Sequence, residues 1–158
     1  MRLHDRLHQE RFASPVNEAI LGVLVTASWL SGEIAQTLDP HGITPAQYNA
    51  LRILRGSDPT RLPCSVVGQR LIDRTPDVTR LLDRLEQAGL AERVRADHDR
   101  RVVLVGITDK GRDVLDRTQP AMEALEARIH ASMPTKDLQA LSDLLDRMRA
   151  TEPEAPAP

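Results

Sequence analysis

The chain has 158 residues, of which 28% are charged and 41% hydrophobic, with a formal net charge of −2; this allows one well-buried domain, or a small domain with additional helices for pairing. No stretch approaches the roughly 20 apolar residues needed to span a bilayer, and the charged N-terminus is not a secretory signal, so we expect a cytoplasmic protein. The single cysteine excludes an internal disulfide framework, and aromatic residues are too scarce for a platform that stacks single-stranded bases.

The first part of the chain predicts two helices. Over residues 15–38 apolar side chains recur at helical spacing, and the sequence DPHG at 39–42 ends this helix with residues typical of turns. Thr44 is a good N-cap, and Pro45 suits the first position of the next helix. The sequence GSDP at 56–59 predicts the end of that second helix.

Two short helices with a tight connection are predicted next. The first opens at residues 63–65 and contains Gly68, whose missing side chain indicates close approach of another helix. The second is expected over residues 75–88, and Gly89 is a good C-terminal stop for it. Its cap, first position and first turn are assigned in that order to Thr75, Pro76 and Asp77. Two short helices joined in this way form the helix-turn-helix pattern.

The remaining elements are a hairpin and two further helices. Residues 90–95 and 102–107 have strand-like composition and are joined by a polar, charged loop. Thr108 should cap a long helix, which Pro120 should kink or divide in two. After a break at residues 133–135, a last amphipathic helix leads to the tail TEPEAPAP, which has no core-forming residues and is expected to be disordered.

Positive charge gathers in the middle of the chain. Residues 70–112 contain ten Arg and Lys against eight Asp and Glu, whereas the remainder contains eleven against fifteen. Of the 21 basic residues 19 are arginine, whose planar guanidinium suits phosphates and guanine edges. A preference for arginine can equally reflect genome composition, so charge alone does not decide the function.

Four segments of the chain, taken together, resemble one protein family. They are ITPAQYNALRIL at 43–54, VVGQRL at 66–71, VTRLLDRLEQAGLAER at 78–93 and DRRVVLVGIT at 99–108. Each is weak alone, but in this order and at this spacing they resemble the multiple antibiotic resistance regulator (MarR) family of winged helix-turn-helix transcriptional regulators. The resemblance is strongest from about residue 43 to residue 109.

This resemblance implies a mainly α fold with a small β-wing. Family members are mostly cytoplasmic homodimers that repress transcription, and many release DNA when a small anionic aromatic ligand binds or a cysteine is oxidised. The implied organisation is an N-terminal dimerisation region at 1–42, a winged helix-turn-helix lobe at 43–109, C-terminal dimerisation helices at 110–150 and a disordered tail at 151–158.

The helix expected over residues 75–88 would be the recognition helix. Its N-terminal amides favour phosphate, and its first turns can reach base edges in the major groove. Asp77 could accept a hydrogen bond from cytosine or only support the helix cap, and a merely solvated polar face is the alternative for the whole helix. The predicted DNA contacts are Thr75, Pro76, Asp77, Thr79, Arg80 and Arg84.

The loop of the hairpin would be the wing. Asp99 and Arg101 are two residues apart, so on an extended segment their side chains leave the same face. The carboxylate can then orient the guanidinium, which can enter the minor groove, as the resemblance also implies for this pair. Arg95 and Arg100 are expected along phosphates. The alternative is a solvated charged turn.

Three further residues carry alternatives. Ser65 could donate to a phosphate or cap its helix, and Lys110, just after the wing, has the same status. Cys64 opens a helix, and because a helix N-terminus can lower the pKa of a thiol, it could be a redox sensor or an incidental structural residue.

An effector site is expected between the dimerisation helices and the winged lobe. A small aromatic or anionic ligand would fit the resemblance, and the side chains assigned to the lining are Trp29, Tyr48, Arg52 and Ile53.

Nothing in the sequence indicates catalysis, a metal or another cofactor. The histidines form one pair at i,i+4 spacing, His4 and His8, near the N-terminus and without a nearby cysteine. No nucleophile elbow, phosphate loop or constellation of carboxylates is present. We therefore expect no enzyme.

The sequence thus predicts a transcriptional regulator that binds specific double-stranded DNA, as a ligand-responsive repressor acting as a homodimer on pseudo-palindromic operators. Amphipathic helices at both ends of the chain support the dimer, which would set two recognition helices about 34–36 Å apart; the alternative is that these helices pack only on their own subunit. The alternatives are a redox-sensing regulator that acts through Cys64 and a winged module for protein interaction that does not bind DNA.

Overall fold

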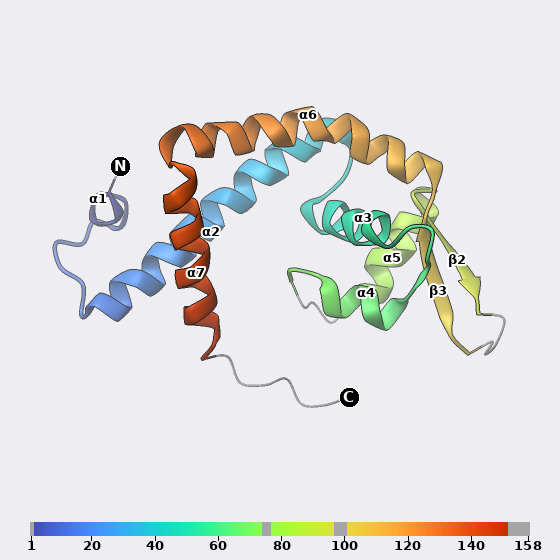
Figure 1. Ribbon diagram of the computed structural model, residues 1–158, viewed down its shortest axis with the longest axis horizontal. Coiled ribbons are helices and arrows are strands. Elements are labelled where there is room, and N and C mark those ends of the chain that lie inside the picture. The colour runs from blue at the N-terminus through green and yellow to red at the C-terminus, as the bar shows by residue number, and fades with distance from the viewer. Residues whose placement is uncertain (1, 74–76, 97–100, 152–158) are drawn as a thin grey trace. The chain divides into compact units, whose positions relative to one another are not determined.

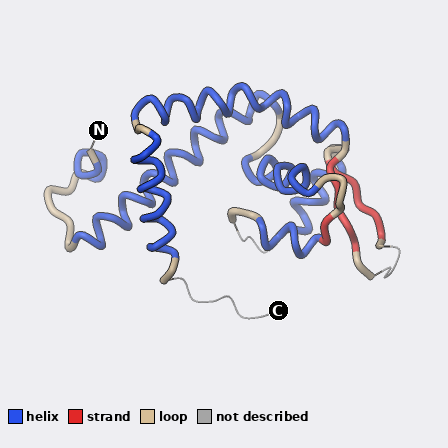
Figure 2. The backbone as a smooth tube through the Cα atoms, viewed as in Figure 1, coloured by secondary structure: helices blue, strands red, loops and turns tan. Residues whose placement is uncertain are grey.

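The computed structural model describes residues 2–73, 77–96 and 101–151 (Figure 1). It divides into two compact units, Met1–Gln119 and Pro120–Pro158. Most described residues are helical, and the strands are confined to one small antiparallel sheet (Figure 2). In chain order the elements are α1 (Leu3–Leu7), α2 (Pro15–Leu38), the 3₁₀ helix η1 (Asp39–His41), α3 (Pro45–Ser57), β1 (Leu62–Pro63), α4 (Cys64–Arg70), α5 (Val78–Gln87), β2 (Ala91–Arg95), β3 (Val103–Ile107), α6 (Asp109–Ser132) and α7 (Thr135–Arg149).

The first unit contains a winged helix-turn-helix lobe built from α3, α4, α5 and the sheet, which confirms the predicted fold class. The strand order is β1-β3-β2, and the β2–β3 register runs from Ala91 opposite Ile107 to Arg95 opposite Val103. Helix α3 packs on β3, and α5 packs on both α4 and β2. The largest fully buried side chains of this lobe are Leu51, Leu54, Val67, Leu82, Leu85 and Val105.

Local signals place most helix ends where they were predicted. Thr44 and Gln47 form a reciprocal capping box at the start of α3, with bonds of 3.3 and 2.9 Å. The Thr108 hydroxyl accepts from the Gly111 amide at 3.1 Å at the start of α6. Gly89 follows α5 with a φ of 70°, a conformation that suits glycine at a helix C-terminus.

Gly68 of α4 confirms the predicted close approach of two helices. A Cβ at this position would lie 2.9 Å from Cγ2 of Val78, the first residue of α5. The side chain of valine is stiff at χ1, so it cannot easily move aside. The missing side chain at residue 68 therefore sets how closely α4 and α5 pack.

The start of α5 corrects the prediction of its N-cap. The described helix begins at Val78, and Asp77 is its N-cap, with Oδ1 accepting from the Arg80 amide at 3.2 Å. The predicted cap and first position, Thr75 and Pro76, lie outside the described residues. Threonine and aspartate are both good N-cap residues, so the sequence alone did not separate two possible starts only two residues apart.

Helix α2 is long and largely uncovered. Of its residues only Leu38 is buried. The helix contacts η1 and α3 within its unit. The span from Pro15 to His41 contains an 18-residue window with a mean hydropathy of 1.3, long and apolar enough to cross a membrane by length and composition. The expectation that no stretch meets this criterion is therefore wrong, although one such helix is weak evidence for a membrane span.

The second unit consists of the end of α6 together with α7. Helix α6 continues through Pro120, so the predicted division of the helix at this proline is wrong, and the alternative of a kink remains a prediction. The boundary between the two units falls at that residue. The predicted break at residues 133–135 is confirmed, because α6 ends at Ser132 and α7 begins at Thr135. The tail beyond residue 151 lies outside the described residues.

Candidate nucleic-acid interface

Helix α5 presents three different faces along its ten residues. The apolar face, with Leu82 and Leu85 fully buried, packs into the lobe. A second face carries Arg80 and Arg84, which are both exposed. Because four residues make slightly more than one turn, these two arginines lie one above the other on the helix surface. The helix is thus fixed to the lobe on one side and cationic on another.

Arg80 is held near the N-terminus of α5 by the residue that caps the helix. Its Nε lies 3.2 Å from Oδ2 of Asp77, while the other carboxylate oxygen of Asp77 accepts from the Arg80 amide. The side chain of Arg80 remains 78% exposed. Asp77 therefore serves as a cap, and a contact between its carboxylate and cytosine remains a prediction.

The hairpin of β2 and β3 lies beside α5 at the edge of the lobe (Figure 1). Arg95 is exposed at the end of β2, and one further backbone bond, from the Ala96 amide to the Val102 carbonyl at 3.0 Å, extends the ladder. Arg101 is an exposed turn residue where the chain enters the returning strand. Asp99 and Arg100 lie outside the described residues, so the pairing of Asp99 with Arg101 remains a prediction.

Two of the four side chains predicted to contact an effector meet in the structure. The hydroxyl of Tyr48 accepts from Nη1 of Arg52 at 3.0 Å, and the guanidinium carbon lies 5.7 Å from the centre of the tyrosine ring. Trp29 is on α2, and Ile53 is a half-buried residue of α3.

A cavity of about 190 Å³ lies elsewhere in the same unit and includes none of these four residues. It is bounded by α2, by the start of α3, by the residues that follow α4 and by α5. On one wall, Oδ1 of Asn49 accepts from the Ile72 amide at 2.9 Å and so ties α3 to the chain that leaves α4. The lining residues are Ser31, Ile34, Pro45, Ala46, Asn49, Leu71, Ile72, Asp73 and Leu81.

Comparison with known proteins decides the family. A model described as MarR family matches residues 41–102. The HTH-type transcriptional regulator YkoM of Bacillus subtilis (strain 168) is 30% identical over 107 residues, which cover 68% of each chain. The crystal structure of a MarR transcription factor from Planctomyces limnophilus is similar at a TM-score of 0.66 and 30% identity, covering 86% of this chain and 98% of that one. The chain belongs to the MarR family.

A further similar structure includes nucleic acid. The transcriptional repressor CouR, solved bound to a 23-mer DNA duplex, has a TM-score of 0.73 and 26% identity and covers 89% of this chain and 99% of that one. The resemblance drawn from the four sequence segments is thus confirmed. The similar proteins are transcriptional regulators rather than enzymes, and repressors are among them.

Lys110 and Ser65, the two additional contacts predicted for a MarR-type interface, differ in their surroundings. Nζ of Lys110 donates to the Ala88 carbonyl at 2.8 Å and so satisfies an orphan carbonyl at the C-terminal end of α5. Ser65 is exposed as the second residue of α4. Pro63 occupies the N-cap position of this helix, so the predicted alternative that Ser65 caps the helix is wrong. Contacts of both residues with phosphate remain predictions.

Cys64, the residue of the redox alternative, is half-buried at the start of α4. Its Sγ lies 3.6 Å from the carbonyl oxygen of Val103, to which it can donate. The thiol therefore links α4 to β3 within the lobe. A role in sensing oxidants remains a prediction.

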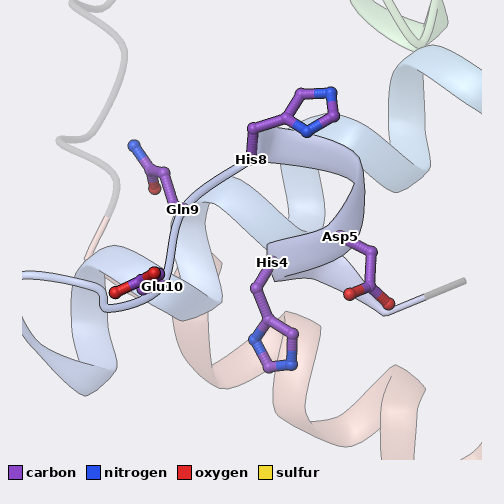
Figure 3. A pocket seen from close by; sticks show the side chains of 5 residues that line it. All are labelled: His4, Asp5, His8, Gln9 and Glu10. Carbon is purple, nitrogen blue, oxygen red and sulfur yellow. The ribbon is translucent and has the colours of Figure 1, made fainter.

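The two N-terminal histidines do not share a helix face. An open hollow of about 530 Å³ around α1 is lined by His4, Asp5, His8, Gln9 and Glu10, and Figure 3 shows the two imidazoles pointing in different directions. The cause is local, since α1 ends at Leu7 and His8 has a φ of 51°. Among the described residues, no group of three or more His, Cys, Asp or Glu side chains could hold a metal ion.

Sequence reasoning missed Arg93 of β2, which contacts the third face of α5. Its guanidinium pairs with Asp83 and Glu86 and also donates to the backbone of Thr79. Two patterns in the sequence could have indicated this contact. Strand alternation places Arg93 on the same face as buried Ala91, and the 79, 83, 86 spacing places its three partners on one helix face.

Proposed function

We propose that this MarR-family protein is a sequence-specific double-stranded DNA-binding repressor that acts in the cytoplasm as a homodimer on pseudo-palindromic operators. The observation that carries the proposal is the arrangement of α5. Its apolar face is fixed in the lobe while Arg80 and Arg84 remain exposed. The hairpin beside it carries exposed Arg95 and Arg101. A helix that can enter the major groove, beside a cationic wing, is an arrangement that suits duplex DNA.

The parts of this surface would have different tasks. The first turns of α5 would read base edges in the major groove, with Arg84 one turn further on reaching a flanking phosphate. Arg101 would enter the adjacent minor groove, where the potential is most negative at narrow A·T-rich sequences. Because phosphate contacts release counterions, the affinity should fall steeply as salt rises. The structure of the similar repressor CouR bound to a DNA duplex supports DNA binding by this chain.

The experiment that tests DNA binding begins with selection of bound fragments from the source genome by the purified protein. Affinity for a selected duplex is then measured by fluorescence anisotropy. We expect Arg101→Ala to lower the affinity at least about tenfold. Arg11→Ala is the matched control, because it removes an equal charge from an exposed position before α2 and should change the affinity less than about twofold.

Two results would contradict the proposal. Wild-type protein that enriches no fragment would favour the alternative of a winged module for protein interaction. Equal affinities of Arg101→Ala and Arg11→Ala would show that the wing is not part of the DNA interface.

The homodimer is supported by exposed apolar side chains on α2 and, separately, on α7. On α2 the exposed apolar side chains include Val16, Ile20, Leu24 and Trp29, and on α7 they include Leu141, Leu144 and Met148. A helix that is apolar over most of its surface requires burial, and a large apolar patch marks an interaction site. In the proposed dimer these helices pair with a second copy, as is common for a two-fold symmetric regulator.

An effector is proposed to act through the cavity between α2 and α5. The cavity is smaller than most drug-binding sites, so it would hold only a small ligand. The hydrogen bond from the Ile72 amide to Asn49 is part of its wall, so a ligand there would act on the chain that connects the two helices of the helix-turn-helix. DNA affinity would then depend on occupancy of the cavity.

This site can be separated from the Tyr48–Arg52 pair predicted from the sequence. A panel of small aromatic acids and neutral aromatic compounds is screened for release of the selected duplex, and two variants are compared on an active compound. Ala46→Leu, which fills the cavity, should abolish release, whereas Arg52→Ala should leave it unchanged. The reverse pattern would move the effector site to Tyr48 and Arg52.

A further inference from the structure

The contact between Arg93 and α5 is a partly buried cluster of charges on the proposed recognition helix. Nη1 of Arg93 donates to Oδ1 of Asp83 and lies 3.4 Å from Oε2 of Glu86, while Nη2 donates to the Thr79 carbonyl at 3.2 Å. The Arg93 side chain is only 21% exposed. We call these four residues the Arg93 cluster.

The two carboxylates of this cluster place negative charge on a helix that is proposed to approach the negatively charged DNA. Asp83 and Glu86 lie on the face next to the one that carries Arg80 and Arg84. Duplex DNA carries one negative charge for about every 1.7 Å of its axis, so unpaired carboxylates on this helix would repel the phosphates. Arg93 places a positive charge against both of them without coming from α5 itself.

The Arg93 cluster also joins two parts of the interface. Arg93 belongs to β2, the first strand of the wing hairpin, whereas its partners lie within two turns of α5. Both terminal nitrogens of the guanidinium contact α5, and a lysine could not reproduce this with its single ammonium group. Its Nε is buried and has no hydrogen-bond partner among the described residues, so the two terminal nitrogens supply these contacts.

We infer that Arg93 is a positioning residue for DNA binding: it is the internal counter-ion of the recognition helix and fixes that helix against the wing. Arg93 would not contact DNA itself. It would neutralise Asp83 and Glu86, so that the phosphates meet Arg80 and Arg84 without opposing charge. The inference rests on the proposed function, because it explains how α5 can approach a polyanion while carrying two carboxylates.

The test compares three chains on the selected duplex. Arg93→Met removes the charge and keeps most of the side-chain length, and we expect it to weaken binding at least about tenfold. Combining Arg93→Met with Asp83→Asn and Glu86→Gln removes the uncompensated charges, and it should return the affinity to within about threefold of wild type. The side chains of Asp83 and Glu86 are 39% and 44% exposed, so the amides that replace their carboxylates remain in contact with water.

A purely structural role would give the same rescue, because the neutral side chains also remove the unpaired carboxylates, but it would not give the expected salt dependence. Repulsion between carboxylates and phosphates is screened by salt, so the deficit of Arg93→Met should shrink between about 50 and 200 mM salt. Arg93→Met binding as tightly as wild type would overturn the inference. So would failure of the triple variant to recover, since Arg93 would then act on DNA directly.

A measurement without DNA separates this inference from the proposed function. In a double-mutant cycle on unfolding, Arg93→Met and Asp83→Asn should be coupled by at least about threefold in the equilibrium constant. Coupling without any DNA binding by wild type would reject the proposed function while retaining the cluster. Additive effects of the two changes would reject the cluster even if wild type binds DNA.

Discussion

The winged lobe and the helix α2 belong to the same unit but differ in how far their apolar side chains are buried. In the lobe, leucines of α3 and α5 are fully buried against one another and against the sheet. In α2, only Leu38 at the C-terminal end is buried, and residues such as Leu24 are 59% exposed. The leucines of the lobe are therefore buried within the unit, whereas apolar side chains along α2 remain exposed.

This difference allows folding of the single chain and the proposed association of two chains to be tested separately. Changes in the core of the lobe should affect folding of a single chain, and changes on α2 should affect association of two chains. The contrast is sharpest where the same residue type occurs in both regions. Substitution of a leucine in each region is therefore the best test of this difference in burial.

The largest expected effect is on the core of the lobe. Leu85→Ala should lower the free energy of unfolding by about 3 kcal/mol, because Leu85 is fully buried and a cavity would remain. Leu24→Ala, the matched change on α2, should cost less than about 1 kcal/mol at dilutions where the protein is monomeric. Guanidinium unfolding followed by circular dichroism over a range of protein concentrations measures both. Equal losses at high dilution would contradict the comparison.

The second prediction concerns association. Leu24→Glu and, separately, Leu144→Glu should each raise the dimer dissociation constant about a hundredfold, because a carboxylate would be buried in an apolar interface. Sedimentation equilibrium measures the constant, and unchanged far-ultraviolet circular dichroism shows that each chain remains folded. Ile72→Glu is the control, since Ile72 is an even more exposed apolar residue but belongs to the lobe. A monomeric wild-type protein would refute the dimer.

The elements that could be predicted from the sequence are those with local signals. The caps Thr44 and Thr108 and the glycines at 68 and 89 each act on the backbone within a few residues or through one close contact. Strand β1 was missed because it consists of Leu62 and Pro63 alone, too few residues to show alternation. It exists because β3 lies beside it, which is a property of the folded chain.

The site was less predictable than the fold because its organisation is not local. Arg93 meets partners that lie between seven and fourteen residues earlier in the chain, and only the packing of β2 on α5 brings them together. The cavity is lined by residues of α2, α3 and α5 and by residues that follow α4, and it shares no residue with the four effector contacts that were predicted. Residue types alone could indicate DNA binding but could not show which charges are neutralised within the chain.

Packing between α4 and α5 provides the third prediction, again within the lobe. Gly68→Ala should cost about 1–3 kcal/mol, because the added Cβ would crowd Val78 at the start of the proposed recognition helix. Gly56→Ala is the matched control on α3, where a Cβ would meet nothing within 4 Å, and it should be neutral or stabilising by about 0.5 kcal/mol. Thermal unfolding distinguishes them. Equal effects of the two changes would mean that the contact between α4 and α5 relaxes freely.

The smallest expected effect is at the N-cap of α5, where it separates helix capping from recognition of bases. Asp77→Ala should lower the free energy of unfolding by about 1 kcal/mol, whereas Asp77→Asn keeps an oxygen for the Arg80 amide and should cost less. If Asp77 acts only as a cap, Asp77→Asn should bind the selected duplex at least as tightly as wild type, because it removes a negative charge near phosphate and releases the Arg80 guanidinium from its ion pair. A loss of tenfold or more, confined to duplexes with a cytosine at one position, would instead assign the carboxylate to base reading.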